Sequence, residues 1–169
     1  ASILTPLAAA FATILFFEAI PEEVAFRGYI YRTLSASKAR WAAGVLTVVL
    51  FVLLPALLFP FQTLVLGMDA SMNGQPYFAP GFLITLAVFG TFLVFLRVVT
   101  GTVWASIGFH LGFVGVNRVI GPDATTAIQF ADITNSIAMQ VTPLVCALAI
   151  LGGLIAYPRI TKQPMGWRE

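Results

Sequence analysis

The chain has 169 residues, of which 59% are hydrophobic and only 9% are charged, and its mean hydropathy is +0.95. Because soluble domains usually carry about 25% charged residues, this composition excludes an ordinary soluble domain and predicts an all-α, polytopic membrane protein. The net charge of +2 is too small to indicate a nucleic-acid partner. A single cysteine, Cys146, excludes a disulfide framework and a cysteine-based metal site.

Five apolar segments follow one another, separated by turns rich in Gly, Pro or basic residues. They cover residues from about 6 to 34, 41 to 59, 80 to 99, 102 to 120 and 127 to 157. Pro21 lies inside the first segment and predicts a bend just before Glu22. Residues 60–79 predict a loop outside the membrane. We interpret residues 1–169 as one membrane domain whose N-terminal part is missing, because the chain starts without Met and without a basic leader.

Basic residues mark one side of the predicted bundle. They follow the first segment, end the third and fill the tail: Arg32, Lys38, Arg40, Arg97, Arg159, Lys162 and Arg168. The positive-inside rule makes these ends cytoplasmic. The sequence therefore predicts about five spans, with the N-terminus outside and the C-terminus in the cytoplasm.

The first segment carries Glu18, Glu22, Glu23 and Arg27 within ten residues. An ionisable group at membrane depth costs roughly 2.5–3.5 kcal/mol on insertion scales, so these groups must pair or serve a function. Glu23 and Arg27 are four residues apart, on one helix face, which predicts an ion pair. Glu18 and Glu22 share a face about 100° away, so one carboxylate is neutralised by Arg27 while another can stay reactive.

His110, the only histidine, lies in the fourth segment. At about 1.5 Å of rise per residue, His110 lies about 13 Å above the cytoplasmic end of its helix, and Glu22 about 15–18 Å above that of the first. Phe51 in the second helix reaches about the same height. The sequence therefore predicts that the carboxylates and the imidazole meet near mid-membrane if the first and fourth helices pack together.

Two stretches resemble one known family. Residues 22–28, EEVAFRG, are similar to the EExxxR motif of the CPBP intramembrane proteases, also called Abi or CAAX-protease-like, and residues 100–110, TGTVWASIGFH, are similar to the run that opens the family's last motif. The family includes the type II CAAX prenyl endopeptidases and bacteriocin-immunity proteins. The resemblance implies an integral protein of the bacterial plasma (inner) membrane that hydrolyses a peptide bond with an activated water. Its implied substrate is a peptide or a membrane protein.

By this resemblance, Glu22 is the general base, His110 holds the water, Asn117 stabilises the oxyanion, and Glu23 with Arg27 orients the site. Two positions depart from the family's pattern: Pro55 stands where the FxxxH motif has its histidine, and Val114 where the HxxxN motif has its asparagine. Asn117 lies one turn further along the same face.

The departures leave alternatives open. The resemblance makes zinc a candidate cofactor, whereas a single histidine argues against the three ligands that catalytic zinc needs, so no metal ligand is assigned. Whether the chain is an enzyme also stays open. The alternative is an inactive family member that acts as a binding, immunity or assembly subunit of a larger membrane complex. A proton or ion pathway is a third interpretation, but no second polar helix continues it.

Overall fold

The computed structural model describes residues 4–67, 71–72, 75–76, 80–120, 152–153, 156–157, 159–160 and 162. The first predicted helix is confirmed as one continuous helical path of five elements. These are α1 (Leu4–Ile14), a π-helical stretch (Leu15–Ala19), α2 (Ile20–Glu23), a second π-helical stretch (Val24–Ile30) and α3 (Tyr31–Ser37). The residue before each junction keeps right-handed helical backbone angles.

The wider π-helical turns keep one row of side chains on the buried face of this path. The row contains Ile14, Ala19, Glu23, Arg27 and Tyr31, all buried. In an α-helix, each step of four residues rotates about 40° beyond a full turn, so such a row would drift around the helix. Turns closed by i→i+5 hydrogen bonds hold more residues and reduce this drift. The winding therefore presents Glu23 and Arg27 to the same side as their apolar neighbours.

Pro21 falls in α2, between the two π-helical stretches. Proline cannot donate a backbone hydrogen bond, and its ring crowds the preceding turn. The neighbouring amide of Ile20 donates to the carbonyl of Leu15, five residues earlier. Local π-helical winding thus accommodates the proline while the path stays helical.

The second helix is longer than predicted. α4 runs over Arg40–Pro60 and continues as a π-helical turn, Phe61–Val65. The predicted loop, residues 60–79, is therefore helical at its start. It also contains two short antiparallel strands, β1 (Ser71–Met72) and β2 (Gln75–Pro76), which the sequence analysis did not predict.

The third and fourth helices agree closely with the predicted segments: α5 spans Pro80–Thr100 and α6 spans Val103–Ile120. Gly101 separates them with a φ of 69°, a left-handed conformation that glycine adopts readily. Its amide donates to the carbonyl of Arg97 at 3.1 Å. The fifth predicted helix, residues 127–157, lies outside the described residues except for 152–153 and 156–157, which are helical.

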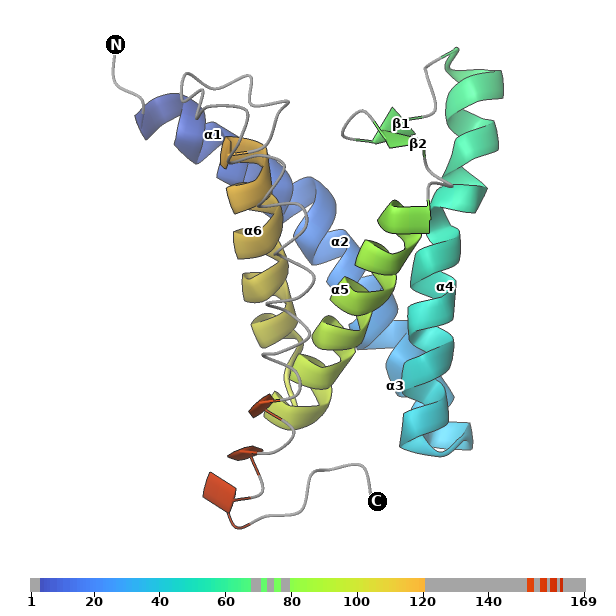
Figure 1. Cartoon of the computed structure of the whole chain (residues 1–169), viewed down its shortest axis with the longest axis vertical. Helices are drawn as coiled ribbons and strands as arrows, with labels where there is room; N and C mark the ends of the chain where they lie inside the picture. Colours follow the sequence, from blue (N-terminus) through green and yellow to red (C-terminus); the bar gives the residue numbers. More distant parts are fainter. Residues whose placement is uncertain are drawn as a thin grey trace.

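The helices cross rather than run as a parallel bundle (Figure 1). The first path runs diagonally, with α1 beside α6 and α3 beside α4, while α5 contacts both α4 and α6. A core cluster of Phe26, Phe51, Phe89 and Leu93 lies where the first path, α4 and α5 meet. Three helices therefore converge on the turn that carries Glu23 and Arg27.

Two of the described helices are long and apolar enough to cross a membrane, Arg40–Val65 and Pro80–Thr100, and Val103–Gly115 is a shorter apolar helix. Large apolar side chains on α4 point outward, and Leu57 is 73% exposed. The chain is helical apart from the two short strands, within the part that the structure describes.

Candidate functional site

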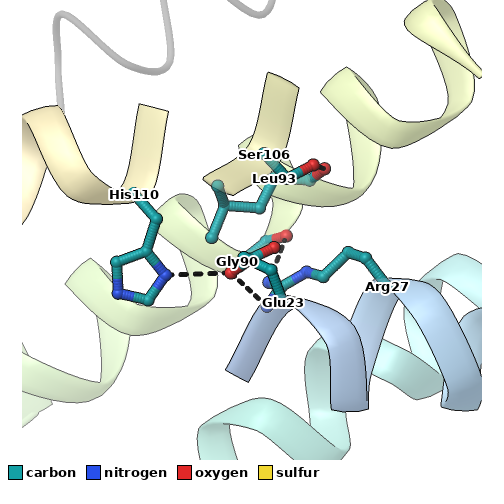
Figure 2. A network of polar contacts seen from close by, with 6 residues as sticks. All are labelled: Glu23, Arg27, Gly90, Leu93, Ser106 and His110. Carbon is teal, nitrogen blue, oxygen red and sulfur yellow. Dashed lines mark hydrogen bonds and ion pairs between the residues drawn. The ribbon is translucent and has the colours of Figure 1, made fainter. Parts of the chain in front are cut away.

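The site is built around the carboxylate of Glu23, which is fully buried. Its Oε1 atom accepts hydrogen bonds from Arg27 Nη1 at 3.1 Å and from His110 Nδ1 at 2.9 Å (Figure 2). Arg27 lies one turn further along the same path, whereas His110 comes from α6. The predicted ion pair between Glu23 and Arg27 is therefore present, and the predicted meeting with the imidazole occurs.

The arrangement differs from the prediction in one respect: Glu23, not Glu22, contacts His110. The sequence analysis made Glu22 the general base beside the water held by His110 and paired Glu23 with Arg27. The two carboxylates differ by only one residue of rise, about 1.5 Å, so matching depths could not separate them. Their directions around the helix differ by about 100°, and the buried row includes Glu23.

Arg27 is fully buried and is held from three sides. Besides Glu23, its Nη2 donates to the carbonyl of Gly90 in α5 at 3.2 Å. Its Cζ lies 4.5 Å from the ring centroid of Phe51 in α4, a cation–π geometry. Arg97 in turn donates to the backbone carbonyl of Arg27 at 3.4 Å.

His110 is 3% exposed. With Glu23 as a carboxylate, which only accepts hydrogen bonds, the contact requires the proton on Nδ1, and a neutral ring then keeps its lone pair on Nε2. Phe89 packs edge-on against the ring, with centroids 5.1 Å apart and planes at 87°. One turn before His110, Ser106 donates to the carbonyl of Leu93 at 3.0 Å and joins α6 to α5. These contacts orient the imidazole, and the contact with the Glu23 carboxylate favours the Nδ1–H tautomer.

Glu22 lies next to this network but belongs to a different environment. It is partly exposed, whereas Glu23 is 0% exposed. It lies close enough to His110, Glu23, Glu18 and Arg27 to interact with them electrostatically, but it forms no ion pair with a side chain in the described part of the chain. Two adjacent carboxylates thus have opposite states: one is neutralised in the core and the other is available.

The remaining predicted positions lie on α4 and α6. Phe51 is buried against Arg27, and Pro55 is buried one turn further along α4, where the family pattern has a histidine. Val114 is half-buried in α6. Asn117 belongs to the last turns of α6, and its side chain lies outside the described residues.

The donor set does not fit a zinc centre. Glu23 Oε1 and His110 Nδ1 are hydrogen-bonded to each other, so neither atom is free to bind a metal ion. A catalytic zinc requires three protein ligands. Among the residues that the structure describes, no group of three His, Cys, Asp or Glu side chains could hold a metal ion. We therefore derive no chemical step through a metal.

The sequence analysis missed Gly90 and Phe89 as members of the site. A Cβ built on Gly90 would lie 3.0 Å from Phe51 Cδ1 and 3.5 Å from Arg27 Nη2. A lone glycine within an apolar membrane helix is a signal for close approach of another element, so Gly90 was detectable in principle. Phe89 stands among many phenylalanines of the same helix, and nothing in the sequence sets it apart.

Comparison with known proteins identifies the family of the chain. The family model described as type II CAAX prenyl endopeptidase Rce1-like matches residues 4–116. No curated protein and no solved structure matches the sequence. The matched segment contains both motifs, with Glu22, Glu23, Arg27 and His110, and ends one residue before Asn117. Since the match covers more than half of the chain, the protein belongs to the Rce1-like, CAAX-protease-like family of membrane-integral proteins.

Proposed function

We propose that this protein is an intramembrane endopeptidase in which Glu22 is the general base. The observation that carries the proposal is the contrast between Glu22 and Glu23. Glu23 is fully buried and its Oε1 is bound by Arg27 and His110, so it is poorly placed to take up a proton from water. Glu22 is next to it, partly exposed, and remains available for proton transfer.

In the proposed reaction, Glu22 accepts a proton from a water molecule, and the resulting hydroxide attacks the carbonyl carbon of the scissile peptide bond. His110 orients this water through the lone pair on Nε2, because its Nδ1–H is held by Glu23. The protonated Glu22 then gives the proton to the leaving amine nitrogen as the C–N bond breaks. Asn117, assigned from the resemblance, is the proposed donor to the oxyanion.

The test is cleavage of a quenched fluorescent peptide anchored in nanodiscs that contain the protein. Removing a general base typically lowers the rate by about 10²–10⁴-fold, so we expect Glu22→Gln to lower kcat by that range. Glu18→Gln is the matched control, because it makes the same change one turn earlier on the same helical path. Cleavage by Glu22→Gln at the wild-type rate would refute the assignment.

A second function is favoured by a specific observation, the buried Pro55 at the position of the family's histidine. In this alternative the chain keeps the fold and the Glu23 network but acts as a binding, immunity or assembly subunit of a membrane complex. The same assay separates the two functions. If the alternative holds, the wild type and Glu22→Gln cleave no anchored peptide, while both remain folded with an intact Glu23–His110 contact.

We further propose one membrane domain with five spans, an outer N-terminus and a cytoplasmic C-terminus in a bacterial plasma membrane. Trp41 at the start of α4 and Trp104 at the start of α6 are 65% and 69% exposed, and Arg97 lies in the last turn of α5, which directly precedes α6. Exposed tryptophans and basic residues at one level are typical of a cytoplasmic interface. Labelling Ser37→Cys with a membrane-impermeant maleimide, in vesicles of known orientation and with Cys146 replaced by Ala, tests whether this end of the helices faces the cytoplasm.

A further inference from the structure

The guanidinium of Arg27 is placed by groups from three separate helices. Glu23 binds Nη1 from the same helical path, the Gly90 carbonyl binds Nη2 from α5, and the Phe51 ring lies 4.5 Å from Cζ on α4. The hydrogen bonds define two directions in the guanidinium plane. The Phe51 ring adds a cation–π contact from α4, closer than that of the Phe26 ring, whose centroid lies 5.8 Å from Cζ.

The position of the Phe51 ring is itself closely defined. Phe26 meets it edge-on, with centroids 5.2 Å apart and planes at 88°, and Phe89 lies at 6.2 Å. Gly90 leaves the space that the ring fills, because a Cβ there would come within 3.0 Å of Phe51 Cδ1. Phe51 is 4% exposed, so these neighbours, and not solvent, surround the ring.

The same ring is connected to the other end of the network. Phe89, which packs against Phe51, also packs edge-on against His110 at 5.1 Å. Arg27 and His110 both donate to Glu23, and both contact one aromatic pair, Phe51 and Phe89. Loss of the Phe51 ring would loosen both donors, because Arg27 would lose its cation–π contact and Phe89 would lose a ring that packs against it.

We propose that Phe51 is a positioning residue, which together with Gly90 fixes Arg27 and thereby holds His110 in the Nδ1–H tautomer on Glu23. This deepens the proposed function, because the tautomer leaves Nε2 to orient the water. Phe51 does not touch the reacting atoms in this scheme. It acts only through the geometry of the Glu23 network.

The single histidine allows a direct test. Protein labelled with [15N]histidine and reconstituted in nanodiscs gives imidazole signals from His110 alone. For the wild type and for Phe51→Tyr, which keeps an aromatic face, we expect two well-separated ring nitrogen signals from one tautomer. For Phe51→Leu we expect these signals to move toward an averaged position, because the imidazole then exchanges between tautomers.

Phe95→Leu is the matched control, because Phe95 is a buried ring of α5 that packs against Phe92. In the described part of the chain, the rings that contact Arg27 are those of Phe26 and Phe51. Unchanged signals in Phe51→Leu, or an equal change in Phe95→Leu, would overturn the proposal. If Phe51→Leu does not fold, Gly90→Ala replaces it, because the added methyl group displaces the ring. Separate signals in a folded Gly90→Ala protein would then overturn the proposal.

The spectrum does not depend on activity, so the two proposals can fail separately. If Glu22→Gln loses cleavage while Phe51→Leu keeps the wild-type spectrum, only the positioning role fails. If the wild type cleaves nothing, the proposed function fails while the spectrum still decides the role of Phe51. If both hold, Phe51→Leu lowers kcat with little change in KM, and Phe51→Tyr restores it.

Discussion

The buried ion pair gives the sharpest prediction. Arg27→Met keeps most of the side-chain volume but removes the charge, both hydrogen bonds and the cation–π contact of a fully buried group. Glu23 Oε1 then keeps only His110, and Glu23 Oε2 already has no hydrogen-bond partner in the described part of the chain. Breaking one partner of a buried pair costs about 3–5 kcal/mol, so we expect Arg27→Met to lower the free energy of unfolding by about that amount.

The measurement is unfolding in mixed micelles with increasing dodecyl sulfate, followed by circular dichroism. Arg32→Met is the control, because Arg32 is an exposed arginine on α3. The double variant Glu23→Gln/Arg27→Met removes both charges, so its cost should fall below the sum of the single costs by about 0.5–3 kcal/mol. A loss below about 1 kcal/mol for Arg27→Met, or strict additivity in the double variant, would refute the role of the pair.

Two further variants test the helix crossings in the same unfolding assay. Gly115→Ala should lower the free energy of unfolding by about 1–3 kcal/mol through overpacking, because its Cβ would lie 2.6 Å from Phe11 Cε1. Gly112→Ala is the control and should have no such effect, because a Cβ there would meet open space. Equal effects of the two variants would argue against the α1–α6 contact. Ser106→Ala removes the hydrogen bond to Leu93, and interhelical bonds in membranes average about 0.6 kcal/mol, with a maximum near 1.7. A loss above about 3 kcal/mol would show that Ser106 supports more than this one bond.

The helices were predictable because the relevant signals are local. Apolar runs define α4, α5 and α6, and Gly101 ends α5 within a residue or two of the predicted break. The spacing of Glu23 and Arg27 predicts their pairing for the same reason. The extension of α4 to Val65 was missed, because the polar residues that follow made the whole segment read as a loop.

The choice between the two carboxylates was not predictable, because it depends on rotation rather than on depth. The π-helical winding around Pro21 changes which side chains face the bundle, and sequence periodicity assumes regular α-helix. The contact of Phe51 with Arg27 could not be predicted from the sequence either. It joins residues of two different helices through packing that no spacing rule describes.

The origin of the Glu23 network in separate helices has a consequence for biogenesis. Its members come from the first helical path, α4, α5 and α6, and in the proposed five-span arrangement these helices enter the membrane one after another during synthesis. When the first path enters, only the partner four residues away is present. We therefore expect the Glu23–Arg27 pair to neutralise the charges during insertion, and the contacts with Phe51, Gly90 and His110 to form in that order as later helices arrive.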